Sequence, residues 1–120
     1  MATSKVTYLG DLRTSSVHLQ SGTEILSDAP VDNNGRGEAF SPTDTVANAL
    51  ASCMLTIMGI KARDMGVALE GTTAEVTKIM ATEPRRISGI KIVFDFKSDA
   101  DEKSRTILER AAMTCPVYHS

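Results

Sequence analysis

The chain has 120 residues and a formal net charge of −2, with 13 basic and 15 acidic residues mixed along it. This length fits one domain over residues 1–120 with a modest core, and no basic stripe is present that could bind a nucleic acid. The N-terminus lacks the apolar stretch of a signal peptide, and no run approaches the ~20 apolar residues of a membrane span. We therefore expect a cytoplasmic protein with no nucleic acid or membrane partner.

The N-terminal third predicts strands. Val6 and Tyr8 alternate with polar residues, and the runs 16–20 and 23–27 flank Ser21 and Gly22 as the two arms of a hairpin. The inner side of this hairpin is expected to carry three apolar residues, which are Val17, Leu19 and Ile25. The segment 28–37 is dense in Pro, Asn, Asp and Gly, which predicts an exposed loop that could border a binding site.

A long helix is predicted from Pro42 to about Met65. Ser41 supplies an N-cap hydroxyl, Pro42 suits the first helical position, and Asp44 places a carboxylate three residues after the cap. Gly66 is a fitting stop. Its apolar stripe is expected to be Val46, Leu50, Cys53, Ile57 and Ile60, flanked by Ala47, Ala49, Ala51, Met54 and Met58. So apolar a helix should run through the middle of the fold.

The remaining segments predict a second hairpin and a second helix. The run 72–80 is β-branched, 82–85 turns the chain, and 87–97 returns with one buried face. Ser98 or Asp99 is expected to cap a helix from Asp101 to about Met113. The apolar side of that helix is expected to carry Ile107, Leu108, Ala111 and Ala112. Pro116 could begin another helix, and the chain is expected to be cut short at Ser120.

Cys53 and Cys115 are 62 positions apart, and no CxxC motif is present. A permanent disulfide is disfavoured in a reducing compartment, so a bond between the two cysteines would form transiently, as part of chemistry. Cys53, in the middle of the long helix, also fits a small apolar residue of the core. Cys115 fits either an inert thiol or a reactive one, whose pKa the N-terminus of a following helix would lower. His18 and His119 do not have metal-ligand spacing, so no metal site is expected.

Arg13 and three other charged residues of the N-terminal region are secondary candidates. Arg13 fits a solvated charge at a strand end, or a guanidinium that keeps a thiolate ionised. Asp44 is mostly explained by capping, although it could orient an arginine. Arg36 and Glu38 lie in the loop and fit solvated side chains.

Two motifs together resemble the OsmC/Ohr family. The run from Phe40 to Asp44, followed by Ala47 to Thr56, is similar to the family's central-helix motif. The run from Glu109 to Val117 is similar to its second cysteine motif, and Leu69–Gly71 and Pro84–Arg86 lie between the two. The resemblance implies an α+β OsmC-like fold, with antiparallel sheets wrapped around a long central helix in an intertwined homodimer.

The same resemblance implies a thiol-dependent peroxidase of the oxidative and osmotic stress response. Cys53 matches the peroxidatic cysteine, Cys115 the resolving cysteine, and Arg13 the arginine that activates the thiolate. The implied substrate is an organic hydroperoxide, and the implied reductant is an external dithiol, dihydrolipoamide or a thioredoxin-type protein, with no metal or bound cofactor. The family's usual glutamate falls on Thr43, with Asp44 about 100° further round the helix. This departure resembles a divergent OsmC-like branch, and the family's C-terminal strand is expected to be absent.

Two other functions fit the sequence. The apolar cleft could bind a ligand without catalysis, with the cysteines as a redox sensor or as part of the core. A thiol-dependent hydrolase or transferase could use Cys53 as its nucleophile, but neither His18 nor His119 is a credible base.

Overall fold

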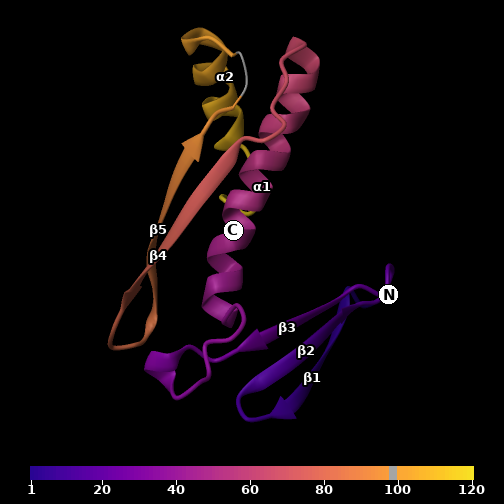
Figure 1. Cartoon of the computed structure of the whole chain (residues 1–120), viewed down its shortest axis with the longest axis vertical. Coiled ribbons are helices and arrows are strands. Elements are labelled where there is room, and N and C mark those ends of the chain that lie inside the picture. The colour runs from indigo at the N-terminus through magenta and orange to yellow at the C-terminus, as the bar shows by residue number, and fades with distance from the viewer. Residues whose placement is uncertain (98–99) are drawn as a thin grey trace. The chain divides into compact units, whose positions relative to one another are not determined.

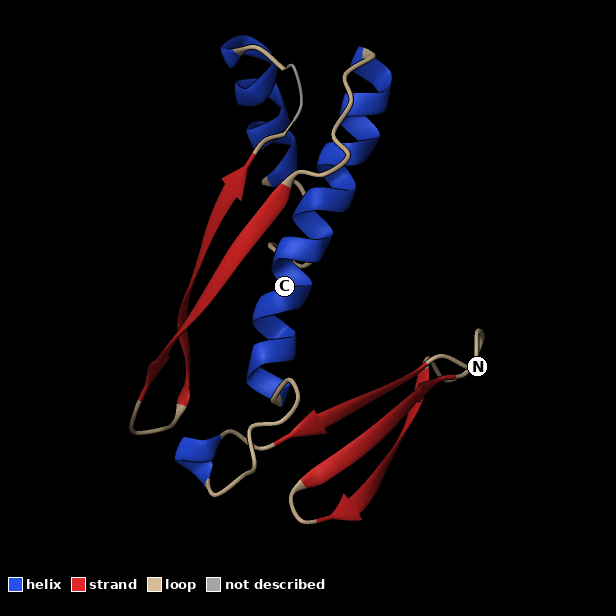
Figure 2. Cartoon of the chain, viewed as in Figure 1, coloured by secondary structure: helices blue, strands red, loops and turns tan. Residues whose placement is uncertain are grey.

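The computed structural model describes residues 1–97 and 100–120. It contains two antiparallel sheets and one long helix, which confirms the predicted α+β class (Figures 1 and 2). The elements are β1 (Ser4–Gly10), β2 (Arg13–His18), β3 (Glu24–Asp28), a short 3-10 turn (Val31–Asn33), α1 (Pro42–Met65), β4 (Thr73–Ala81), β5 (Arg86–Asp95) and α2 (Glu102–Ala112). Met1–Thr45 and Val46–Ser120 form two compact units, each described by itself below.

The first unit is a three-stranded sheet in the order β1-β2-β3. The predicted hairpin is present as β2 and β3, but its loop covers 19–22, since His18 and Thr23 close it through a backbone hydrogen bond of 2.8 Å. Ile25 lies opposite Ser16, and Val17 lies opposite Glu24. Because neighbouring residues of a strand point to opposite faces, Val17 and Ile25 are on different faces. The predicted common inner face was wrong, and Leu19 lies beyond the strand and is exposed.

The predicted limits of α1 are confirmed at both ends. The Asp44 N–H donates to the Ser41 hydroxyl and the Ser41 N–H donates to the Asp44 carboxylate, both at 3.0 Å. This reciprocal pair is a capping box, which satisfies backbone donors that the first turn leaves unpaired. At the other end Gly66 has φ +69°, a conformation that suits glycine, and the Val67 N–H closes the last turn on the Ala62 carbonyl.

The buried face of α1 lies one residue round from the predicted stripe. The buried residues are Ala47, Ala51, Met54, Met58 and Ala62, whereas Leu50, Cys53 and Ile57 are only half-buried. Val46 and Ile60, predicted at the two ends of the stripe, are more than half exposed in the single chain. Because α1 carries apolar residues on nearly every side, the sequence could not show which side faces the core.

By length and composition, α1 is also apolar enough to cross a membrane, contrary to the expectation that no segment would qualify. One such helix is weak support for a span, because core helices have the same composition. Met54, Met58 and Ala62 of this helix pack in a protein core, and 28% of the apolar window is buried in the single chain.

The second unit packs β4, β5 and α2 against α1, which Figure 1 shows as neighbouring elements. β4 and β5 form the predicted antiparallel hairpin, and β5 half-buries residues of one face, among them Ile90, Ile92 and Phe94. Helix α2 buries Leu108 and Ala112, as predicted. The predicted caps, Ser98 and Asp99, lie outside the described residues. The N-cap is Asp101, whose carboxylate accepts the Ser104 N–H at 2.8 Å.

Candidate functional site

The two cysteines meet in the core of the second unit. Cys115 is fully buried in a cluster with Met54, Met58, Ala62, Leu108 and Ala112, and Cys53 packs against this cluster from α1. Cys53 is only half-buried, and both cysteines are free thiols. The fold thus brings together two thiols that the sequence separates by 62 positions, and Cys53 lies close enough to affect the pKa of Cys115.

Of the two interpretations that the sequence left open for Cys115, the structure favours the less acidic thiol, because its pKa is raised above that of an ordinary cysteine. Burial is the main cause that raises the pKa of Cys115, and the neighbouring Cys53 raises it further. The chain after Pro116 forms turns, closed by His119 N–H to Pro116 carbonyl and Ser120 N–H to Val117 carbonyl bonds, and not the suggested helix. One expected feature is present, because the Tyr118 N–H donates to the Cys115 sulfur at 3.3 Å, and this bond opposes the rise in pKa.

In the first unit Arg13 is held by two carboxylates. Its Nε and Nη2 donate to the two oxygens of Asp28 at 2.7 and 2.9 Å, and Nη2 also donates to Glu38 at 3.1 Å. Asp28 is directly opposite Arg13 in the β2–β3 register, so both side chains lie on one face of the sheet. Hydrogen bonding to Arg13 lowers the pKa of Asp28, and the same pair raises the pKa of Arg13 above that of an ordinary arginine.

Two residues of this cluster were missed from the sequence. Asp28 was assigned to the exposed loop, but it ends β3 and is 1% exposed. Glu38 was interpreted as solvated, and its side chain is indeed largely exposed, yet it contacts Arg13. A hairpin predicted with the loop at 19–22 would have paired Arg13 with Asp28. The opposite charges of these two residues, at the far ends of the two strands, could therefore have indicated the ion pair. Arg36 contacts Asp11 at 3.4 Å in an exposed pair.

Asp44 and Thr43 lie at the start of α1, where the family's glutamate was expected. The Asp44 carboxylate accepts the Ser41 N–H, and the Thr43 hydroxyl is 3.2 Å from the Ser41 hydroxyl. The capping role predicted for Asp44 is therefore confirmed. The carboxylates that bind Arg13 in the hydrogen bonds above come from Asp28 and Glu38.

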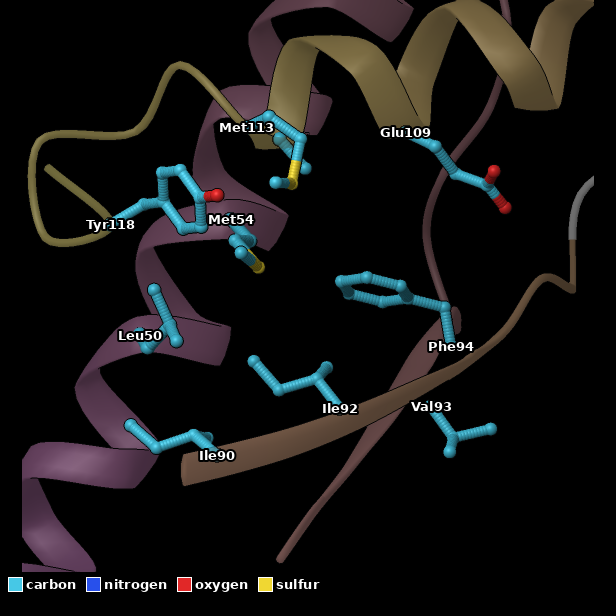
Figure 3. Close-up of a pocket in the computed structure, with 10 residues that line it drawn as sticks. Leu50, Met54, Ile90, Ile92, Val93, Phe94, Glu109, Met113 and Tyr118 are labelled. Carbon is cyan, nitrogen blue, oxygen red and sulfur yellow. The ribbon is translucent and has the colours of Figure 1, made fainter. Parts of the chain in front are cut away.

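The second unit also contains an apolar pocket of about 550 Å³ between α1, β5, α2 and the C-terminal turn (Figure 3). Its residues are Leu50, Met54, Ile90, Ile92, Val93, Phe94, Glu109, Ala112, Met113 and Tyr118. Met54 and Ala112 belong both to this lining and to the cluster around Cys115, so the pocket adjoins the thiols. Within residues 1–97 and 100–120, no group of three or more His, Cys, Asp or Glu residues is placed to hold a metal ion.

Comparison with known proteins decides the family. The family model for OsmC-like proteins matches residues 35–120, which include both cysteine motifs and the pocket. The chain belongs to the OsmC-like protein family. No curated protein sequence matches it significantly.

Several solved structures share the fold of this chain. A Psychrobacter arcticus protein, whose name refers to osmotic stress induction and a detoxification response, is 62% identical with a TM-score of 0.96, over 99% of this chain and 87% of that one. An OsmC-like protein from Mycoplasma pneumoniae is 16% identical with a TM-score of 0.79, over 97% and 83% of the two chains. A Vibrio cholerae protein, whose name refers to organic hydroperoxide resistance, is 18% identical with a TM-score of 0.65, over 99% of this chain and 83% of that one.

Proposed function

We propose that this OsmC-like protein is a thiol-dependent peroxidase that reduces organic hydroperoxides in the cytoplasm. The observation that carries the proposal is the pairing of Cys53 and Cys115 within one apolar cluster beside an apolar pocket. Membership of the OsmC-like family and the name of the Vibrio cholerae relative support a stress-related redox role.

In the proposed reaction the Cys53 thiolate attacks the peroxide oxygen distal to the organic group. The O–O bond breaks, the organic oxygen takes a proton and leaves as an alcohol, and Cys53 becomes a sulfenic acid. The Cys115 sulfur then bonds to the Cys53 sulfur, and the sulfenic oxygen leaves as water with the thiol proton. An external dithiol reduces the disulfide and is itself oxidised.

Arg13 enters this proposal as the cation that keeps Cys53 ionised. Asp28 and Glu38 fix the orientation of its guanidinium, while Nη1 makes no hydrogen bond with the described residues and can serve a further acceptor. Arg13→Lys keeps the charge but loses the planar two-nitrogen contact, so we expect peroxidase activity to fall in Arg13→Lys and further in Arg13→Ala.

We also propose that the protein acts as a homodimer. Val6, Ser16 and Ile25 are paired across the three strands and share one face, and the apolar members are about 60% exposed in the single chain. Apolar side chains exposed to water on one sheet face favour association. Light scattering after size-exclusion chromatography should give twice the mass of the chain, and a monomer at micromolar concentration would contradict this part of the proposal.

The peroxidase proposal is tested by stoichiometric cumene hydroperoxide followed by intact-mass and peptide mass spectrometry. The wild-type chain should lose two hydrogens, and Cys115→Ser should instead gain one oxygen on Cys53. Cys53→Ser is the matched control and should show neither change. A wild-type protein that consumes no cumene hydroperoxide in the presence of excess dihydrolipoamide would refute the proposal.

Non-catalytic ligand binding is the second candidate, and the pocket of about 550 Å³ favours it. This volume lies within the range of roughly 300–1,000 Å³ that is typical of small-molecule sites. Under this alternative, ligands would bind with the same affinity to the wild type and to Cys53→Ser. The cysteine substitutions would leave the rate of hydroperoxide consumption unchanged.

A further inference from the structure

The apolar pocket has an uneven distribution of charge. Eight of its ten residues are apolar, Tyr118 contributes a neutral hydroxyl, and Glu109 is the charged residue of the lining. In Figure 3, Glu109 extends from α2 on the side of the pocket where Phe94 lies, and Ile92 rises from β5 toward Met54. An apolar space with one carboxylate at its edge distinguishes ligands of equal shape by their charge.

The basic residues of α2 near Glu109 do not line the pocket. Arg105, one turn earlier on α2, has its guanidinium 5.6 Å from the centre of the Phe96 ring and does not line the pocket. Among the described residues, no ion pair joins Glu109 to a cation. Glu109 also lies near the C-terminal end of α2, where the helix dipole contributes negative potential.

We propose that this pocket binds the organic part of an amphiphile that carries no negative charge, and that Glu109 is the residue that rejects carboxylate-bearing ligands. The consequence for substrates rests on the proposed function: neutral alkyl and aryl hydroperoxides would be accepted, and fatty-acid hydroperoxides would be disfavoured. The preference in ligand binding does not depend on peroxidase activity. Met54 and Ala112 line the pocket and also belong to the cluster that contains Cys115, so a bound ligand would lie next to the thiol cluster.

Three unreactive probes with one apolar body test the binding: octanol, octanoate and octylamine at pH 7.5 and about 0.15 M salt. Methyl NMR shifts of Ile90, Ile92, Met54 and Met113 report occupancy of the pocket. Octanoate should bind the wild type roughly tenfold more weakly than octylamine, with octanol between them, as expected for one unit charge at an exposed pocket edge. Glu109→Gln should bring octanoate and octanol to within about twofold, and Glu109→Lys should reverse the order of octanoate and octylamine.

Glu102→Gln is the matched control. Glu102 lies on the same helix, seven residues before Glu109, outside the lining and about 10 Å away along the axis, which exceeds the screening length of ~8 Å at this salt concentration. This variant should keep the wild-type order. The proposal is overturned if none of the three probes shifts the pocket methyls, or if Glu109→Gln retains the full discrimination against octanoate.

Parallel peroxidase assays separate this proposal from the previous one. One outcome is a protein that shows the expected binding order but reduces neither cumene hydroperoxide nor a carboxylate-bearing hydroperoxide. This outcome would refute the peroxidase proposal and support the charge-selective pocket. Equal turnover of both hydroperoxides, with equal binding of the three probes, would support the peroxidase and overturn the role of Glu109.

Discussion

Leu108→Ala measures how strongly the core of the second unit protects Cys115. The Leu108 side chain is fully buried in the cluster that contains Cys115, Met58 and Ala112. The substitution removes three carbon groups, which costs about 2.4 kcal/mol at ~0.8 kcal/mol each. The cavity left behind raises the loss of unfolding free energy to about 3–4 kcal/mol. A chain of this size has a total stability of roughly 6–18 kcal/mol, so this loss is a large part of it.

The same substitution should accelerate the alkylation of Cys115. A fully buried thiol reacts only when its surroundings open, and opening of this cluster costs less free energy once Leu108 is truncated. Each 1.4 kcal/mol is a factor of ten in an equilibrium, so a loss of about 3–4 kcal/mol corresponds to roughly 100- to 1,000-fold faster alkylation. Cys53, which is half-buried, should react readily in both proteins.

Urea denaturation followed by circular dichroism gives the stability, and iodoacetamide labelling with peptide mass spectrometry gives the rate at each cysteine. Met113→Ala is the control, because Met113 follows the same helix but is 45% exposed, and it should lose about 1 kcal/mol or less. Equal alkylation rates for Cys53 and Cys115 in the wild type, or a loss of less than about 1 kcal/mol in Leu108→Ala, would contradict the reasoning.

Three further predictions concern stability. Ser41→Ala removes the cap hydroxyl of α1 and should lower the urea unfolding free energy by about 1 kcal/mol. Arg13 lowers the pKa of Asp28, so the ionised Asp28 carboxylate stabilises the fold at pH values above its ordinary pKa of about 4. This stabilisation is lost as the pH falls through the lower pKa that Asp28 has in the folded protein. Thermal melts from pH 6 to 2 should therefore show less acid destabilisation in Asp28→Asn than in the wild type. Burial raises the pKa of Cys115, so the folded protein favours the neutral thiol. The urea midpoint of the wild type should therefore fall as the pH rises past about 8.5, the ordinary pKa of a thiol. The urea midpoint of Cys115→Ala should not show this fall.

Local signals in the sequence were enough to predict most of the elements. The limits of α1 follow from Ser41, Pro42, Asp44 and Gly66, whose effects on the backbone depend on residues within one turn. The β4–β5 hairpin follows from alternation along a strand with one buried face. The family was predicted from two cysteine motifs at the expected separation along the chain. The secondary-structure signals alone would not have identified it.

Features that depend on pairing or packing were not predicted. The register of β2 on β3 depends on a loop of four residues, and placing the turn at Ser21 and Gly22 moved Asp28 away from Arg13. The rotation of α1 depends on what covers it, because nearly every side carries an apolar residue. The pKa of Cys115 depends on burial by Leu108 and its neighbours, and burial outweighs the opposing hydrogen bond from the Tyr118 N–H.

The low acidity of Cys115 suits a resolving cysteine better than an acidic thiol, the other alternative that the sequence left open, would have done. A thiol that stays protonated and fully buried does not compete with Cys53 for peroxide, since the thiolate is the nucleophile. Once Cys53 is a sulfenic acid, its hydroxyl can leave as water with the Cys115 proton, and the Tyr118 N–H stabilises negative charge that develops on the Cys115 sulfur. Under the proposed mechanism the half-buried thiol is thus oxidised first and the buried one second. Peroxide in excess should accordingly leave Cys115 free of sulfinic acid while the disulfide forms.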